Sequence, residues 1–192
     1  MRLFLYQLAA VMLLLLAPTG PVQAVLLESW ENAGLAGYNN QEGPWTRAAQ
    51  APANLELSFS ELHATQGKYS LAIKTWGGWT QTVLNGDNYT YTLGDEISLR
   101  DAFEDKLMLA IDVYCDRSVE WAQMHIALQG EGLEWTQLAG YDLRPGGSRT
   151  IRYLIPDAAA EKIKASDGWF QVIFIINSNK PGCIYLDRFR AE

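Results

Sequence analysis

An unusual set of polar side chains follows every second position of residues 119–135, when that stretch is read as a β-strand. One face of the strand carries apolar side chains that suit a core, namely Ala122, Met124, Ile126 and Leu128. The other face carries an indole, an imidazole and two amides, from Trp121, Gln123, His125 and Gln129. An indole offers a flat apolar surface, whereas amides and imidazoles donate and accept hydrogen bonds. The mixture indicates a binding surface for a polar ligand.

The same combination recurs on other predicted strands. Alternation places Gln171 and Asn177 with Trp169, Gln81 with Trp79, and Asp112 with Tyr114 and Asp116. Sugars have apolar C–H patches and a rim of hydroxyls, so a carbohydrate site needs aromatic platforms beside groups that donate and accept. We therefore predict one carbohydrate-binding face made of Trp121, Gln123, His125, Tyr114, Asp112, Gln171 and Trp79. The alternative for each tryptophan is packing under a loop.

The usual catalytic motifs are absent from the sequence. There are two histidines and two cysteines, and neither pair has the spacing of a zinc site; G-x-S-x-G and G-x-x-x-x-G-K also do not occur. A glycosidase needs only two carboxylates. The pairs at hand lie in turn-like segments where solvated surface is expected, namely Glu131/Glu134, Asp101/Glu104/Asp105 and Asp95/Glu96. We predict a protein that is not an enzyme.

Two other functions stay open at this stage. The first is a small secreted glycan-cleaving enzyme, a glycosidase or lyase, with Asp112 and Asp116 as acid and base. Jelly-roll glycosidases often carry an E-x-D-x-E pattern on one strand, and its absence favours binding over catalysis. The second is a cell-surface adhesion or structural module without a sugar ligand.

The elements that must position these residues are almost all strands. Short β-branched or aromatic runs, separated by Gly, Asn, Asp and Pro clusters, predict strands at 56–64, 69–76, 79–84, 89–93, 106–115, 120–129, 134–143, 149–156, 169–177 and 183–190. The helical pattern is confined to 156–166, with Asp157 expected as its N-cap. We predict an all-β protein, an antiparallel β-sandwich (jelly roll) with one short helical insertion.

Three segments carry a family resemblance. The opening LLESWENAGLAGY (26–38) resembles the first motif of carbohydrate-binding modules with the galactose-binding-domain-like jelly-roll fold. HATQGKYSLAIK (63–74) is similar to their second strand, and GCIYLDRFR (182–190) to their closing strand. The order and spacing cover nearly all of residues 25–192, so the resemblance implies this fold, although the fold alone does not identify a ligand.

The resemblance also implies a structural calcium ion where the first and last strands meet. Its ligands would be the carboxylates of Glu31 and Asp187 and main-chain carbonyls of the Gly67-Lys68 turn. Ca²⁺ prefers about six to eight oxygen ligands, which such a set begins to supply. Arg188 stands where the family often has Asn, so the alternative is that Glu31 and Asp187 form ion pairs with Arg188 or Arg190.

The N-terminus predicts export. Arg2 precedes a leucine-rich run, and small residues at Val22 and Ala24 suit signal peptidase. The uninterrupted apolar run from Leu8 to Ala17 is shorter than the roughly 18 residues of a membrane anchor. We predict a signal peptide at 1–24, a single domain at 25–192, a secreted or periplasmic location and no membrane insertion after cleavage.

Charge and cysteine content narrow the partners. The formal net charge is −7 and there is no Lys/Arg stripe, which argues against nucleic acid. The expected partner is a polysaccharide or oligosaccharide held on the concave face of the sandwich by a monomeric protein. Cys115 and Cys183 would meet an oxidising compartment, where pairs are often bridged, but a bridge requires Cα atoms within about 7 Å.

Overall fold

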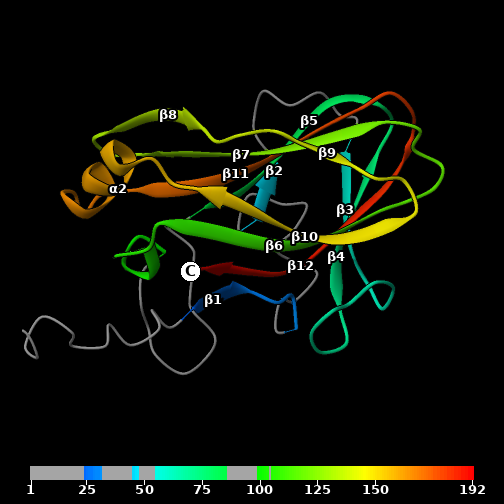
Figure 1. Cartoon of the computed structure of the whole chain (residues 1–192), viewed down its shortest axis with the longest axis horizontal. Helices are drawn as coiled ribbons and strands as arrows, with labels where there is room; N and C mark the ends of the chain where they lie inside the picture. The colour runs from blue at the N-terminus through cyan, green and yellow to red at the C-terminus, as the bar shows by residue number, and fades with distance from the viewer. Residues whose placement is uncertain (1–23, 32–44, 48–54, 86–98, 104) are drawn as a thin grey trace, which may run out of the picture.

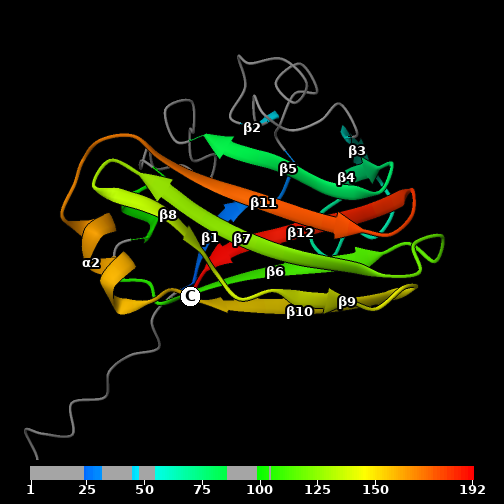
Figure 2. The same cartoon turned by 90° about the horizontal axis from the view of Figure 1, so that it is seen from above.

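Strands with alternating apolar residues pair into two antiparallel sheets in the computed structural model, which describes residues 24–31, 45–47, 55–85, 99–103 and 105–192. The sheets face each other, and the α-helix of the described residues lies at one end (Figures 1 and 2). The predicted all-β sandwich with a short helical insertion is confirmed. The predicted strand at 89–93 and the predicted signal residues before Ala24 lie outside the described residues.

Sheet A contains the described strands of the three segments that carry the family resemblance. Its order is β10 (Gly147–Leu154), β6 (Met108–Cys115), β12 (Gly182–Ala191), β4 (Ser70–Thr75) and β3 (Leu55–Ser60), and β1 (Val25–Glu28) pairs with the end of β12. The opening strand and the second strand therefore both lie beside the closing strand β12. A register shift interrupts β12 between Asp187 and Arg190, where Arg188 adopts a positive φ of 50°.

Sheet B contains the strand with the unusual polar face. Its order is β2 (Trp45–Arg47), β5 (Gly78–Asn85), β11 (Phe170–Ser178), β7 (Ala122–Gly130) and β8 (Leu133–Gln137), and β9 (Tyr141–Leu143) also pairs with β7. The predicted strand 134–143 is thus two strands. The break includes Gly140, where a Cβ atom would lie 2.2 Å from Cε1 of His125, so a glycine lets the chain cross this imidazole.

The inward faces of the two sheets make one hydrophobic core. From sheet B, the predicted core residues Ala122, Met124, Ile126 and Leu128 are fully buried, which confirms the inward face of β7. From sheet A, Leu109, Ile111 and Val113 of β6 pack into the same cluster. Apolar side chains removed from water in this way are the main source of folding stability.

Helix α2 (Asp157–Lys164) contacts β8 and the 3₁₀ turn η3 (Asp101–Phe103). Asp157 is its first residue rather than its N-cap, so that prediction is wrong. Pro156 is the N-cap, because it has extended backbone angles and its carbonyl accepts hydrogen bonds from the amides of Ala159 and Ala160. The guanidinium of buried Arg100 donates to the carbonyl of Ile163 at 2.8 Å and closes the other end of the helix.

Cys115 and Cys183 are both free. Ile184 is directly opposite Cys115 across β12 and β6, so Cys183 points to the other face of sheet A. Cys115 is buried in the core, and its burial raises the pKa of the thiol to about 11. The two sulfur atoms therefore lie on opposite sides of one sheet and form no bridge.

Candidate functional site

The outward face of sheet B brings together most of the predicted site residues. Strand register aligns them in rows that cross β5, β11, β7 and the edge strands. One row contains Trp79, Asn177, Gln123 and Asp142, and the next contains Gln81, Ile175 and His125. Gln171 lies farther along the same face, opposite Gln129. The structure therefore places five of the predicted site residues on one face, namely Trp121, Gln123, His125, Gln171 and Trp79.

Side-chain hydrogen bonds link the polar residues of this face into a chain. Gln123 donates to Oδ1 of Asp142 at 3.3 Å, and its Oε1 lies 2.9 Å from Nε2 of His125. The other ring nitrogen, Nδ1, lies 3.1 Å from the amide nitrogen of Gln137. Both imidazole nitrogens are therefore engaged, and the ring is held in one orientation. Gln171 donates to Gln129 at 2.9 Å in a second, separate pair.

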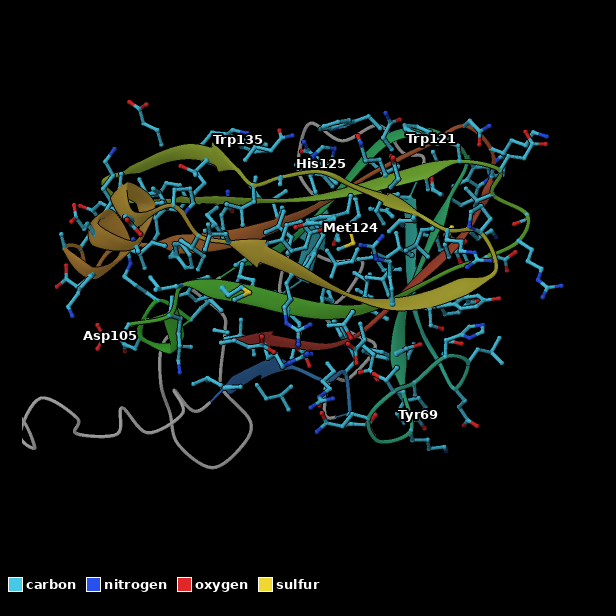
Figure 3. The ribbon with its side chains drawn as sticks, viewed as in Figure 1. Tyr69, Asp105, Trp121, Met124, His125 and Trp135 are labelled. Atoms are coloured by element: carbon cyan, nitrogen blue, oxygen red, sulfur yellow. The ribbon has the colours of Figure 1, made fainter. Side chains whose placement is uncertain are left out.

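Exposed tryptophans surround these amides. Trp121 is 40% exposed, Trp79 is 41% exposed and Trp135 is 43% exposed. Trp121 flanks β7 at one end, where its amide and carbonyl pair with Asn179, and the ring of Trp79 lies 6.0 Å from that of His125. Figure 3 shows Trp121, His125 and Trp135 on the outward side of sheet B, with Met124 between the sheets. Their exposure argues against full burial of these tryptophans under a loop.

The centre of the same face is apolar and closed. Val83, Ala127, Ile173 and Ile175 form a second buried cluster, separate from the main core. Register places Val83, Ile173 and Ala127 in one row, next to the row of Gln81, Ile175 and His125. The accessible groups of the face are therefore the tryptophans and amides around this cluster.

Tyr114 and Asp112 do not belong to this face, and their predicted place beside Trp121 is wrong. Both lie on β6 and point outward from sheet A, on the opposite side of the sandwich. Alternation correctly separated them from the core residues of β6, but alternation does not tell which sheet a strand joins. Strand order places β6 between β10 and β12, so these two side chains face a different environment.

Asp112 is a buried structural carboxylate. It accepts hydrogen bonds from the hydroxyls of Thr65 and Thr150, both at 2.7 Å, and faces the guanidinium of Arg190 at 3.6 Å. Asp116, its proposed partner in catalysis, accepts from the amide of Ser118 in its own turn. Of the other carboxylates considered, Glu131, Glu134, Asp101 and Asp105 are exposed, as expected of solvated surface.

The residues predicted to hold calcium converge on one loop. Residues 61–69, the 61–69 loop, join β3 to β4 across the outward face of sheet A. Oε1 of Glu31 accepts from the amides of Lys68 at 2.8 Å and Tyr69 at 2.6 Å. Oδ2 of buried Asp187 accepts from the amides of Thr65 and Gln66. Two carboxylates that are far apart in the sequence thus anchor the loop, Asp187 at its middle and Glu31 at its last residues.

These contacts determine how calcium would have to fit. The loop presents amide hydrogens to Glu31 and Asp187, whereas Ca²⁺ requires oxygen ligands. A Cβ at Gly67, which has a φ of 69°, would lie 2.3 Å from Cδ of Glu31, so the loop and carboxylate are in close contact. Among the described residues, no group of three or more His, Cys, Asp or Glu side chains is placed to hold a metal.

The ion pairs expected as the alternative to calcium are not found among the described residues. Arg190 pairs with Asp112 and Glu192 rather than with Glu31 or Asp187. Arg188 contributes its backbone amide to Asp187 at 2.7 Å. Burial raises the pKa of Asp187, and the hydrogen bonds from Gln66, Thr65 and Arg188 oppose that rise.

Comparison with known proteins identifies the fold. No protein-family model and no curated protein matches the sequence. The family 11 carbohydrate-binding module of the cellulosomal cellulase Lic26A-Cel5E of Clostridium thermocellum is similar in structure, with a TM-score of 0.52 and 14% identity over 88% of this chain and 94% of that one. The non-crystalline cellulose-specific carbohydrate-binding module CBM28 gives a TM-score of 0.57 and 14% identity over 88% and 95%. This is the β-sandwich fold of carbohydrate-binding modules.

The carbohydrate-binding-module fold also occurs inside larger enzymes. An exo-β-agarase matches with a TM-score of 0.55 and 10% identity, over 87% of this chain and 24% of that chain. At such identities the likeness concerns the fold, so the ligand must be argued from the residues of this chain. In the described residues there is no helix long and apolar enough to cross a membrane.

Sequence reasoning missed three residues of the outward face. Gln137 and Trp135 alternate on β8, and that pattern could have placed them with His125 once β8 was paired with β7. Asp142 lies on β9, after the segment that separates β9 from β8, and its contact with Gln123 depends on the path of the chain at Gly140. No local signal in the sequence predicts that contact.

Proposed function

We propose that this protein is an exported, non-catalytic carbohydrate-binding protein that holds a polysaccharide or oligosaccharide on the outward face of sheet B. The observation that carries the proposal is the pair of exposed tryptophans beside the amides of Asn177 and Gln123: Trp79 lies in the same row, and Trp121 lies two residues before Gln123. The names of the similar modules support the same class of ligand.

The chemistry of the face suits a neutral glycan. An indole face attracts the C–H surface of a sugar ring, and amides both donate to and accept from its hydroxyls. The chain from Asp142 through Gln123 to His125 and Gln137 orients these groups before a ligand arrives. Groups that are already oriented lose less conformational entropy on binding.

Absence of catalysis is part of the proposal. Asp112 is buried by Thr65, Thr150 and Arg190, and Asp116 is engaged in its own turn. This use of both carboxylates supports binding over cleavage. Export rests on the predicted signal peptide, and N-terminal sequencing of secreted protein is expected to begin at Val25.

The structural calcium ion at Glu31, Lys68 and Asp187 is a separate proposal. Its support is the convergence of two carboxylates on the 61–69 loop. The ion would require the loop to turn carbonyl oxygens toward Glu31 and Asp187 in place of the amides.

A glycan array probed with the secreted protein tests the function, with reducing-sugar release measured on every glycan that binds. We expect binding without release. Trp79→Ala should weaken binding of the selected glycan, whereas Trp76→Ala should not. Trp76 is the matched control because it is also exposed but lies over the ammonium of Lys74 at the end of β4. Release of reducing sugar, or equal loss in both variants, would contradict the proposal.

A further inference from the structure

A pocket lies on the outward side of sheet A, on the opposite side of the sandwich from the proposed glycan face. It has a volume of about 170 Å³ and opens between the 61–69 loop, β6 and β10. Its polar lining comes from six side chains, those of His63, Thr65, Asp112, Tyr114, Ser148 and Thr150. Neither the core nor the sheet B face uses this pocket.

The pocket presents hydrogen-bond acceptors in fixed directions. The hydroxyls of Thr65 and Thr150 both donate to Asp112 at 2.7 Å, so their lone pairs stay available to a ligand. Asp112 accepts these two bonds on different oxygens, and a carboxylate has about four acceptor sites in all. A ligand that donates several hydrogen bonds is therefore favoured here.

Donors and an apolar wall complete the lining. The exposed hydroxyl of Ser148 can donate to a ligand as well as accept from it. The imidazole of His63 stacks on Tyr114, with ring centroids 3.4 Å apart and planes at 10°, and meets Tyr185 edge-on. These rings form the flat side of the pocket.

His63 is held in place by an uncommon backbone conformation. Its φ of 59° lies in the left-handed region, which few residues other than glycine adopt. Thr65, two residues later, donates its hydroxyl to Asp112 and its backbone amide to Asp187. The loop is thus fixed at the residues that line the pocket, so His63 stands over Tyr114 without a ligand.

Size and charge determine the ligand class. Pockets for drug-sized ligands enclose at least about 300 Å³, so this one suits a smaller molecule. An anionic ligand would meet the carboxylate of Asp112, and a cationic one would meet Arg190, which pairs with Asp112 at 3.6 Å. A neutral molecule rich in hydroxyls satisfies both the acceptors and the donors.

We propose that this pocket binds a single neutral sugar unit, independently of the glycan face on sheet B. Binding of one unit in a pocket differs from binding along an open face, because only one ring enters. The protein would then hold two glycan contacts on opposite sides of the sandwich.

Amide chemical-shift titration by NMR tests the proposal, with the methyl glycosides of glucose, galactose, mannose and xylose as probes. The protein is the double variant Trp79→Ala/Trp121→Ala, which removes both tryptophans of the sheet B face. We expect at least one probe to shift the amides of Thr65, Tyr114 and Ser148–Thr150. Because this variant lacks the tryptophans of the sheet B face, the titration measures the pocket alone. A negative result here would therefore not contradict glycan binding on sheet B, and a negative glycan array would not contradict the pocket.

Two matched substitutions decide whether the shifts belong to the pocket. Ser148→Phe should fill it and weaken binding by about tenfold or more, whereas Ser58→Phe should leave binding unchanged. Ser58 is the control because it is also exposed on the outward face of sheet A, at the other edge. Shifts with none of the four probes, shifts confined to sheet B, or equal loss in both variants would overturn the proposal.

Discussion

On the outward face of sheet B, Gln123, His125 and Gln137 bond to one another and stay partly exposed, whereas on sheet A Asp112 and Asp187 lie buried beneath the 61–69 loop. Both faces are polar, and both alternate with core residues in the same way. The amides of sheet B remain open to an external ligand. The buried carboxylates of sheet A already accept hydrogen bonds from amides and a hydroxyl of the 61–69 loop.

The two faces differ in the free-energy cost of a polar side chain that has no hydrogen-bond partner within the protein. A buried carboxylate without partners is costly, so sheet A requires its loop and Arg190. An exposed amide forms hydrogen bonds with water when no ligand is bound, so the free protein loses little stability by leaving the amides of sheet B exposed. Substitutions of the buried carboxylates of sheet A should therefore mainly change stability, and substitutions of the exposed amides of sheet B should mainly change binding.

The largest expected effect is on sheet A. Asp112→Ala removes the acceptor of Thr65 and Thr150 and leaves Arg190 without this carboxylate, so the free energy of unfolding should fall by about 3 kcal/mol. Gln123→Ala on sheet B is the matched control and should cost less than about 1 kcal/mol. Urea denaturation of both variants checks the difference, and similar midpoints would show that the two faces do not differ in this way.

The calcium proposal sharpens the comparison next. An ion that binds only the folded protein stabilises it by about 2.7 kcal/mol at a hundredfold excess over Kd. Addition of a chelator should therefore lower the Tm, and Asp187→Ala should remove that response. Glu61→Gln should retain it, because Glu61 pairs with the Lys68 side chain on the surface of the same loop. Identical melting curves with and without chelator, at low residual metal, would remove calcium from this site.

Trp121→Ala tests the other face. Loss of one ring that stacks on a sugar should weaken glycan binding by about 1–3 kcal/mol, or about 5- to 150-fold, by analogy with stacking on nucleic-acid bases. Because Trp121 is partly exposed, its removal should cost less stability than the roughly 3–5 kcal/mol typical of a buried tryptophan. Affinity and urea midpoint are measured on the same variant.

The inward neighbour gives the control for that variant. Met124→Ala lies on the same strand but in the core, so it should lose about 2–5 kcal/mol of stability. A large loss of stability at Trp121, or full affinity for a confirmed glycan, would mean that Trp121 belongs to the fold rather than to the site.

Particular residues show which parts of the candidate site could be predicted from the sequence. Alternation correctly separated Trp121, Gln123 and His125 from Met124, because the period of two is a local property of any strand. It placed Tyr114 and Asp112 on the wrong side, because the pairing of β6 with β10 and β12 depends on contacts far apart in the chain. The pocket at His63 was missed because the predicted strand 56–64 included His63, whereas β3 ends at Ser60 and His63 lies in the 61–69 loop.

The smallest expected effect concerns acid. Glu192 lies at the end of β12, where burial alone would raise its pKa, but hydrogen bonds from Arg152 and Arg190 outweigh burial and lower it below the usual 4.5. A lowered pKa means that the folded state binds its proton less tightly than the unfolded state. The stabilisation is therefore complete above pH 4.5 and is lost as the pH falls through the lower folded value.

Glu192→Gln isolates this contribution, which should be about 1 kcal/mol or less because the ion pairs are partly exposed. The variant should be less stable than wild type at neutral pH and should approach it at low pH, as urea midpoints measured across the acid range would show. Subtraction from wild type removes the opposite contribution of Asp187, whose raised pKa favours the folded state as pH falls. Gln129→Ala on sheet B should keep the wild-type slope, because its contact is to the amide of Gln171 and does not titrate. The proposed difference between the faces would be contradicted if the urea midpoint of Gln129→Ala changed with pH differently from wild type, or if that of Glu192→Gln changed with pH as in wild type.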